Sequence, residues 1–198
     1  MTQTKTIISS LIFSLLCFIP IFSRAFEKLP EHYTLSLGSK NAQHTVTEYF
    51  SLSCPLCLRL LKKEFKEIYQ AYIQTKKIHW TFHPDPADLS TWQLMVCLER
   101  LPPSKKWSFF WEAIQTIKPN HPSQNTFLLQ ELSKQFGLDL PLLHDIKWLE
   151  STKAFQEALK YTKQADAPTE IPIIAFNGTL EPYLLPTKQV IDELTNEP

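Results

Sequence analysis

The chain has 198 residues, and its 20 lysine and arginine residues are balanced by 20 aspartate and glutamate residues. This balance gives no basic bias of the kind expected for a protein that binds nucleic acid or an anionic membrane surface. The sequence contains only three glycines, widely separated, which excludes a glycine-rich phosphate-binding loop.

The first 25 residues have the features of a secretory signal peptide. Lys5 is followed by an apolar stretch, residues 7–22, and then by Ser23-Arg24-Ala25, a small-x-small cleavage site. The apolar stretch is shorter than the ~20 residues that cross a bilayer comfortably, so an uncleaved membrane anchor is the less favoured interpretation. Cleavage would leave one domain, residues 26–198, whose 173 residues can bury a substantial core.

The first half of this domain alternates between strand and helix patterns. The predicted elements are a strand at 33–37, a strand at 44–50, a helix with an apolar face from 58 to 72, and a strand at 78–83. Gly38-Ser39 marks a turn after the first strand. The apolar face of the helix is formed by Leu58, Leu61, Phe65, Ile68 and Tyr72.

The second half is helical until close to the C-terminus. The pattern from about residue 89 to 165 predicts several helices, interrupted by prolines at 102–103 and 119–122 and by Gly137, which is placed as a helix C-cap. Asn177-Gly178 then predicts a hairpin between strands at 172–176 and 180–184. A short helix at 187–194 ends the chain.

The motif Cys54-Pro55-Leu56-Cys57 lies between the second strand and the first helix. A thiol at a helix N-terminus is exposed to unpaired backbone N–H groups and the positive end of the helix dipole, and both favour the reactive thiolate. Pro55 suits the first helical turn, where its missing N–H has no cost. The spacing therefore predicts a pair that closes and reopens a disulfide by exchange.

The order of these elements is that of a thioredoxin-like α/β fold with an all-helical insertion at about residues 88–166. The chain resembles the DsbA-like family of exported thiol–disulfide oxidoreductases. Four blocks in order carry the resemblance: LGSKNAQHTVTEYFSLSCPLC, MVCLERLPPSKKWSFFWEAI, ELSKQFGLDL and EIPIIAFNGTL. The resemblance implies an enzyme that exchanges disulfides with exported protein substrates in the periplasm and is recycled by a membrane redox partner.

The resemblance also implies roles for individual residues. Cys54 matches the exposed nucleophile, and Cys57 matches the buried resolving cysteine. Pro172 matches a proline that follows a cis peptide bond, so that the backbone of Ile171 faces an incoming peptide. Pro55 and Leu56, between the cysteines, complete the expected substrate-binding set. The alternative for Pro172 is that it simply begins an ordinary strand.

Glu48 shares a strand face with Val46 and Phe50, which places a carboxyl group among apolar neighbours. It also matches the acid found beneath the active site in DsbA-like proteins. A carboxyl group shielded from water has a raised pKa and can exchange a proton with the resolving thiol. The alternative is a glutamate that points to solvent or pairs with a lysine.

Leu56 departs from the best-known oxidants of the family, which have histidine between the cysteines. Leucine offers no donor to the Cys54 thiolate, so we expect a less oxidising enzyme than the histidine-bearing type. Ile171, before Pro172, also resembles the reducing thioredoxins more than the oxidants. The third cysteine of the exported domain, Cys97, lies in an apolar helical run and is interpreted as a buried hydrophobic residue.

Other chemistry has weaker support. The histidines lack the spacing of a metal-binding helix, so no metal site is predicted, and exchange requires no bound cofactor. A peptide-binding or chaperone-like module with dispensable cysteines is the alternative from another functional class, and a metal-binding protein is the third. Nearly all residues of the exported domain are used by the fold, which favours a monomer.

Overall fold

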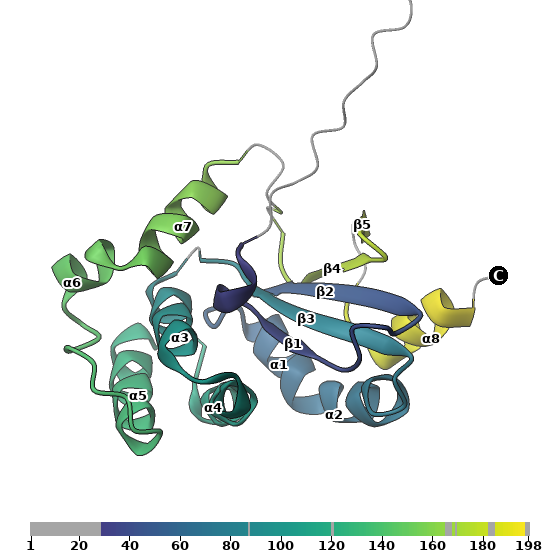
Figure 1. Cartoon of the computed structure of the whole chain (residues 1–198), viewed down its shortest axis with the longest axis horizontal. Coiled ribbons are helices and arrows are strands. Elements are labelled where there is room, and N and C mark those ends of the chain that lie inside the picture. Colours follow the sequence, from purple (N-terminus) through teal and green to yellow (C-terminus); the bar gives the residue numbers. More distant parts are fainter. Residues whose placement is uncertain are drawn as a thin grey trace, which may run out of the picture.

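The computed structural model describes residues 29–86, 88–119, 121–164, 168, 170–181 and 185–196. A five-stranded sheet and its flanking helices form one part of the molecule, and a group of helices lies beside the end at which the second and third strands finish (Figure 1). The strands are β1 (Leu35–Leu37), β2 (His44–Phe50), β3 (Ile78–Pro84), β4 (Ile173–Phe176) and β5 (Thr179–Glu181). The helices are α1 (Pro55–Lys63), α2 (Phe65–Ile68), α3 (Leu89–Arg100), α4 (Pro103–Thr116), α5 (Pro122–Gln135), α6 (Ile146–Ser151), α7 (Lys153–Thr162) and α8 (Lys188–Asn196).

The sheet has the strand order β1-β3-β2-β4-β5, with β2 at its centre. β2 is parallel to β3 and antiparallel to β4, and Glu48 lies opposite Phe82 on one side and Ile174 on the other. Both faces of the second half of β2 are covered, because every residue from Val46 to Phe50 is buried. The thioredoxin-like fold with a helical insertion, α3 to α7 between β3 and β4, is therefore confirmed.

The helix that follows the cysteine pair has the predicted apolar face, and all five of its members are buried. The structure differs from the prediction of one continuous helix. A break at Glu64 separates α1 from α2, and α2 continues into a π-helical segment, Tyr69–Ile73. The apolar spacing carries on across the break, so the pattern alone did not reveal it.

The hairpin at Asn177-Gly178 is confirmed, since both residues have positive φ angles, 48° and 87°, as a two-residue turn of this type requires. The Asn177 side chain also reaches back to the central strand, where its Oδ1 accepts a hydrogen bond from the Thr45 backbone N–H at 3.0 Å. The turn is thereby fixed to the start of β2.

The ends of the insertion helices use the residues expected for caps. The side chains of Asp88, Asp145 and Thr152 accept backbone N–H groups at the N-termini of α3, α6 and α7. After the C-terminus of α5, Gly137 has a φ angle of 80°, and the N–H of Leu138 donates to the Ser133 carbonyl at 2.9 Å. Gly137 is therefore the C-cap that the sequence predicted.

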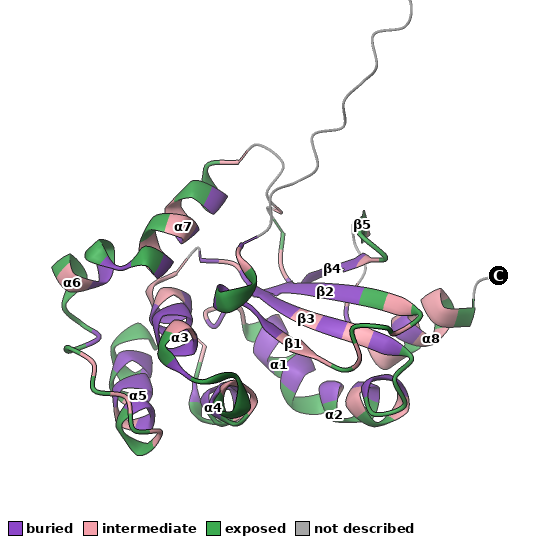
Figure 2. Ribbon diagram, viewed as in Figure 1, coloured by how far each residue is buried: buried purple, intermediate pink, exposed green. Residues whose placement is uncertain are grey.

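A cluster of aromatic side chains joins the sheet to the insertion. Phe110 of α4 packs against Phe82 of β3 and Phe50 of β2, with ring centroids 4.7 and 5.5 Å apart. All three side chains are almost fully buried. Buried residues run along most of β2 and β3 (Figure 2). Phe109 of α4 is also fully buried, and Trp107 and Trp111 are half-buried against the same core.

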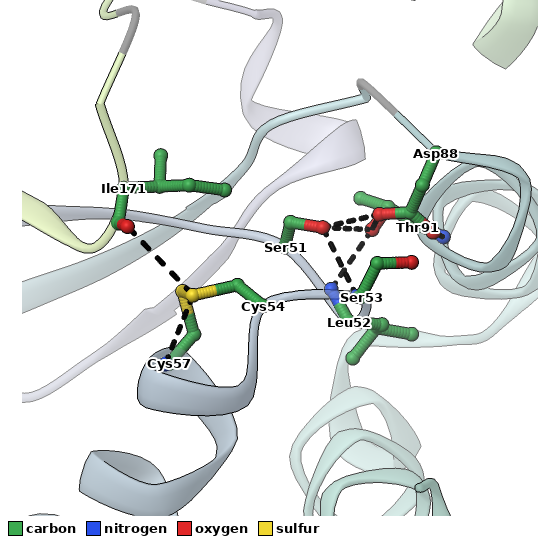
Figure 3. The surroundings of a disulfide bond; sticks show 8 residues. All are labelled: Ser51, Leu52, Ser53, Cys54, Cys57, Asp88, Thr91 and Ile171. Atoms are coloured by element: carbon green, nitrogen blue, oxygen red, sulfur yellow. Dashed lines mark hydrogen bonds between the residues drawn. A yellow bond between two sulfur atoms is a disulfide. The ribbon is translucent and has the colours of Figure 1, made fainter. Parts of the chain in front are cut away.

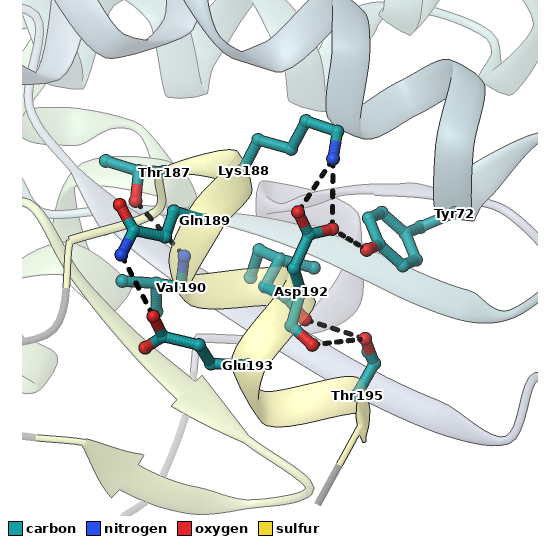
Figure 4. A network of polar contacts seen from close by, with 9 residues as sticks. Tyr72, Thr187, Lys188, Gln189, Val190, Asp192, Glu193 and Thr195 are labelled. Carbon is teal, nitrogen blue, oxygen red and sulfur yellow. Dashed lines mark hydrogen bonds and ion pairs between the residues drawn. The ribbon is translucent and has the colours of Figure 1, made fainter.

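The last helix is fastened to the π-helical segment by a polar network (Figure 4). The Tyr72 hydroxyl donates to the Asp192 carboxylate, and the same carboxylate pairs with Lys188 at 2.7 Å. The Tyr72 contact holds α8 against the helical layer that follows the cysteine pair, and the Lys188 pair lies within α8 itself.

The first and last strands can be compared with their predicted limits. Tyr33 belongs to a 3-10 turn, Glu31–Tyr33, and the first strand begins only at Leu35. The last strand ends at Glu181 in the described part of the chain. The predicted signal peptide lies outside the described residues. Within the described residues, no helix has the length and apolar character needed to cross a membrane.

Candidate active site

The cysteine pair begins α1. Cys54 is the N-cap residue, with an extended backbone, and Pro55 and Leu56 follow in the first turn. Proline at this position needs no hydrogen-bond partner, and the last turn carries Lys62 and Lys63, which complement the helix dipole. The local sequence therefore places Cys54 at the positive end of the helix.

Cys54 and Cys57 are joined as a disulfide, with their Cα atoms 5.2 Å apart. The backbone N–H of Cys57 donates to Cys54 Sγ at 3.1 Å, so the sulfur takes the place of a capping oxygen (Figure 3). Cys57 is fully buried, whereas Cys54 is half-buried. The arrangement leaves one sulfur accessible, with a backbone donor in position to stabilise its thiolate.

Ile171 and Pro172 lie directly beside the pair. Their peptide bond is cis, as predicted, and the Ile171 carbonyl oxygen lies 3.7 Å from Cys54 Sγ (Figure 3). Pro172 is buried at the start of β4, and Ile171 is half-buried. Residues separated by more than a hundred positions therefore meet at the accessible sulfur.

Pro55 and Leu56 lie at the surface of this site. Pro55 is exposed and Leu56 is half-buried. Leu56 has no polar side-chain atom, so the only hydrogen-bond donor to Cys54 Sγ in the described residues is the Cys57 backbone.

Glu48 is completely buried in the centre of β2, and burial raises the pKa of its carboxyl group to about 8. The indole N–H of Trp80 donates to Oε2 at 3.2 Å, which counteracts part of this rise. In the described part of the chain, Oε1 has no hydrogen-bond partner and no lysine or arginine pairs with the group. The alternative of a solvent-facing or lysine-paired glutamate is wrong.

Trp80 was not identified from the sequence as a partner of Glu48. The two residues come from neighbouring parallel strands, and Val46, not Glu48, lies directly opposite Trp80. The contact depends on a diagonal reach across the sheet, which strand pattern alone does not reveal.

A second set of residues missed by the sequence analysis holds the loop before Cys54. The Ser51 hydroxyl donates to Asp88 Oδ2, and the Leu52 backbone N–H donates to the Thr91 hydroxyl at 3.0 Å (Figure 3). Asp88, three residues before Thr91 at the start of a helical pattern, has the spacing of an N-cap, but nothing in the sequence connects it with Ser51.

The described residues contain one further cysteine, Cys97, which is not part of the disulfide. Cys97 is fully buried in α3, and burial raises the pKa of its thiol to about 12, so it is unreactive as a nucleophile. The described residues contain no group of three or more histidine, cysteine, aspartate or glutamate side chains arranged to hold a metal ion.

Comparison with known proteins agrees with this architecture. A family model described as thioredoxin matches residues 31–180. No curated protein matches the chain. Among solved structures, oxidised BdbD from Bacillus subtilis has a TM-score of 0.66 at 16% identity, covering 86% of this chain and 95% of its own.

Two further structures share the fold. Chlamydia trachomatis DsbA has a TM-score of 0.61 at 17% identity, with 81% of this chain and 88% of its own covered. Wolbachia pipientis α-DsbA1 has a TM-score of 0.61 at 20% identity, with 84% and 93% covered. The chain belongs to the thioredoxin family and has the DsbA-like form of its fold.

Proposed function

We propose that the protein is an exported thiol–disulfide oxidoreductase that exchanges disulfides with protein substrates through Cys54 and Cys57. The observation that carries the proposal is the position of Cys54 Sγ. It is accessible at the N-terminus of α1, accepts the Cys57 N–H at 3.1 Å, and lies 3.7 Å from the Ile171 carbonyl oxygen. A reactive sulfur beside an available backbone carbonyl is what exchange with a peptide requires.

In the oxidising direction, a substrate thiolate attacks Cys54 Sγ. The new bond joins the substrate sulfur to Cys54, and the Cys54–Cys57 bond breaks with its electron pair on Cys57. A second substrate thiolate then attacks the first substrate sulfur and releases Cys54 as a thiolate. The Cys57 N–H and the helix terminus stabilise that leaving thiolate, which lowers the barrier to its departure.

Glu48 is proposed to carry the proton that this cycle needs. With a pKa of about 8, its carboxyl group is protonated at neutral pH, and it can donate to Cys57 when that sulfur leaves. In the reducing direction the ionised form of the same group accepts the Cys57 proton before Cys57 attacks the mixed disulfide. The unpartnered Oε1 atom supports this role, because it is not occupied by another hydrogen bond in the described residues.

Substrate binding is proposed to use the backbone of Ile171, next to Pro172, together with the accessible surfaces of Pro55 and Leu56. An extended peptide placed along Ile171 would bring its cysteine to Cys54. We further propose that residues 1–25 direct export to the periplasm, that the substrates are exported proteins, and that a membrane redox partner recycles the cysteine pair.

Leu56 supports a reduction potential below that of the strongly oxidising members of the family. A side-chain donor between the cysteines would stabilise the reduced form, and leucine has none. We therefore expect a potential clearly more negative than about −120 mV, towards the thioredoxin value of about −270 mV.

The test is the equilibrium of the purified protein with mixtures of reduced and oxidised glutathione, read by mass after the free thiols are alkylated. The wild type and Cys97→Ala should show one reversible two-electron couple, whereas Cys54→Ser and Cys57→Ser should show none. Cys97→Ala is the matched control, since it removes a cysteine that is buried and not joined to the pair.

Each result has a defined meaning. A reversible couple in the wild type, lost in both active-site variants, supports the oxidoreductase. A couple near −120 mV contradicts the argument from Leu56 but leaves the exchange activity in place. No reversible couple in the wild type would contradict the proposed function.

A further inference from the structure

A hydrogen-bond network outside the cysteine motif connects the loop before Cys54 to the first turn of α3. The loop consists of Ser51, Leu52 and Ser53, and the helical partners are Asp88 and Thr91 (Figure 3). Ser51, Leu52 and Thr91 are each at most 3% exposed. These three residues therefore lie in the interior, where an unmade hydrogen bond has its full cost, whereas Asp88 and Ser53 are half-buried.

One carboxylate organises the network. Asp88 Oδ1 accepts the Thr91 backbone N–H at 2.9 Å and so caps α3. Asp88 Oδ2 accepts the hydroxyl protons of both Ser51 and Thr91, the latter at 2.6 Å. A hydroxyl group has one proton to donate, so the carboxylate fixes the direction in which each hydroxyl donates.

The lone pairs of the two hydroxyl groups are consequently turned toward the loop. The Thr91 hydroxyl accepts the Leu52 N–H at 3.0 Å, and the Ser51 hydroxyl accepts the Ser53 N–H at 3.1 Å. Two consecutive backbone N–H groups, immediately before Cys54, are therefore held through two hydroxyls by one carboxylate.

The loop in turn determines the position of the reactive sulfur. Cys54 donates its own backbone N–H to the Ser51 carbonyl at 3.3 Å, and it has the extended N-cap conformation, φ −83° and ψ 111°. In that conformation Sγ accepts the Cys57 N–H. A loop that is free to move would populate conformations in which the thiolate loses this donor.

We propose that Asp88, acting through Ser51 and Thr91, is a positioning residue for disulfide exchange. It couples the first turn of the helical insertion to the thiolate form of Cys54. The inference rests on the proposed function for its biological meaning, but the property it concerns, the acidity of the Cys54 thiol, can be measured in the reduced protein without any exchange reaction.

The substitution Asp88→Asn separates the two roles of the carboxylate. Asparagine is as good an N-cap as aspartate, so its carbonyl oxygen can still accept the Thr91 N–H. Its NH₂ group cannot accept protons from the two hydroxyls, which lose the acceptor that orients them. Thr91→Val removes one of the hydroxyls at nearly constant shape, and Thr91→Ser restores it.

Asp145→Asn is the matched control. Asp145 caps α6 in the same insertion, with Oδ1 accepting the Trp148 N–H at 3.1 Å, and it is exposed. The chemical change is identical, but within the described residues no hydrogen bond connects this cap to the loop before Cys54.

The experiment measures the rate of Cys54 alkylation by iodoacetamide against pH, in reduced protein with Cys97→Ala as the background. Below the midpoint pH, Asp88→Asn and Thr91→Val should react about three- to tenfold more slowly, because the thiolate fraction falls when its donor is lost. Thr91→Ser and Asp145→Asn should follow the background profile.

A second measurement excludes a purely structural effect. Thermal unfolding of each reduced variant, in the same Cys97→Ala background, reports whether it is folded at the assay temperature. A variant that melts earlier but keeps the background alkylation midpoint would show that the network only stabilises the fold. Unchanged midpoints in both Asp88→Asn and Thr91→Val, in folded proteins, would overturn the inference. The two conclusions can fail separately. If the wild type has no reversible couple with glutathione but the variants still shift the alkylation midpoint, the proposed function is wrong and the positioning role of Asp88 stands.

Discussion

At the scale of single residues, Glu48 combines full burial with one occupied and one unoccupied carboxylate oxygen in the described structure. The sequence predicted its burial because it shares a strand face with Val46 and Phe50. It did not predict Trp80 as the donor, because that contact depends on how two strands lie beside each other. Position in one strand is encoded locally, whereas partners across strands depend on the completed sheet.

The raised pKa of Glu48 makes stability depend on pH in a definite direction. The folded protein keeps the proton up to about pH 8, whereas the unfolded chain releases it near its ordinary pKa. The folded state therefore binds more protons between these values, and the free energy of unfolding falls as pH rises through this window. The stabilisation is fully present below the pKa of Glu48 in the unfolded chain. It is lost once the pH exceeds the pKa of Glu48 in the folded protein.

We expect Glu48→Gln to be close to the wild type in stability near pH 4.5 and more stable by roughly 2 kcal/mol or more at pH 8, since each pKa unit corresponds to about 1.4 kcal/mol. Glutamine has no charge to bury and retains an oxygen for the Trp80 N–H. Urea unfolding of the oxidised proteins at several pH values measures the difference. Glu131→Gln, at a surface ion pair, is the control and should show no such trend. A difference that does not grow with pH would contradict the raised pKa.

At the scale of elements, the predictions succeeded where the signal is local. The β-branched and aromatic pattern at His44–Phe50 has the bounds of β2, and the Asn177-Gly178 pair forms the predicted turn. The break at Glu64 was missed because the apolar spacing of a helix continues through it. The link between Ser51 and Asp88 was missed because it joins two loops far apart in the chain.

Gly137 tests one of these local signals. We expect Gly137→Ala to lower the free energy of unfolding by about 1–2 kcal/mol, because an L-residue is strained at a φ angle of 80°. A Cβ atom at this position would contact nothing within 4 Å, so the cost comes from the backbone conformation alone. Gly137→Asn should cost less, since asparagine tolerates this conformation better. Equal stability of the alanine variant and the wild type in urea unfolding would contradict the C-cap assignment.

At the scale of the whole molecule, the sheet and the insertion share one core. Phe110 of the insertion packs against both Phe50 and Phe82 of the sheet, and all three are almost fully buried. The order of elements predicted the insertion, but only the packed structure shows that its aromatic side chains complete the sheet's core. The two parts should therefore unfold together.

Phe110→Ala should destabilise the protein by about 3–5 kcal/mol, the usual cost of removing a fully buried phenylalanine side chain. Because the core is shared, the urea transition should remain single when followed by both tryptophan fluorescence and circular dichroism. Phe127→Ala is the matched control, since Phe127 is 65% exposed and its removal should cost no more than about 0.5 kcal/mol. Separate transitions by the two probes would show that the insertion unfolds independently.

The strand order has a consequence for the course of folding during synthesis. The central strand β2 pairs with β3 soon after both are made, but its other edge waits for β4, which begins only at Ile173. Until then the middle of the future sheet is an open edge, the kind of surface on which chains associate wrongly. Ile171 arrives with the same late segment. The segment that covers this edge and the residue that places a carbonyl beside Cys54 are therefore the same late part of the chain, which follows all the insertion helices.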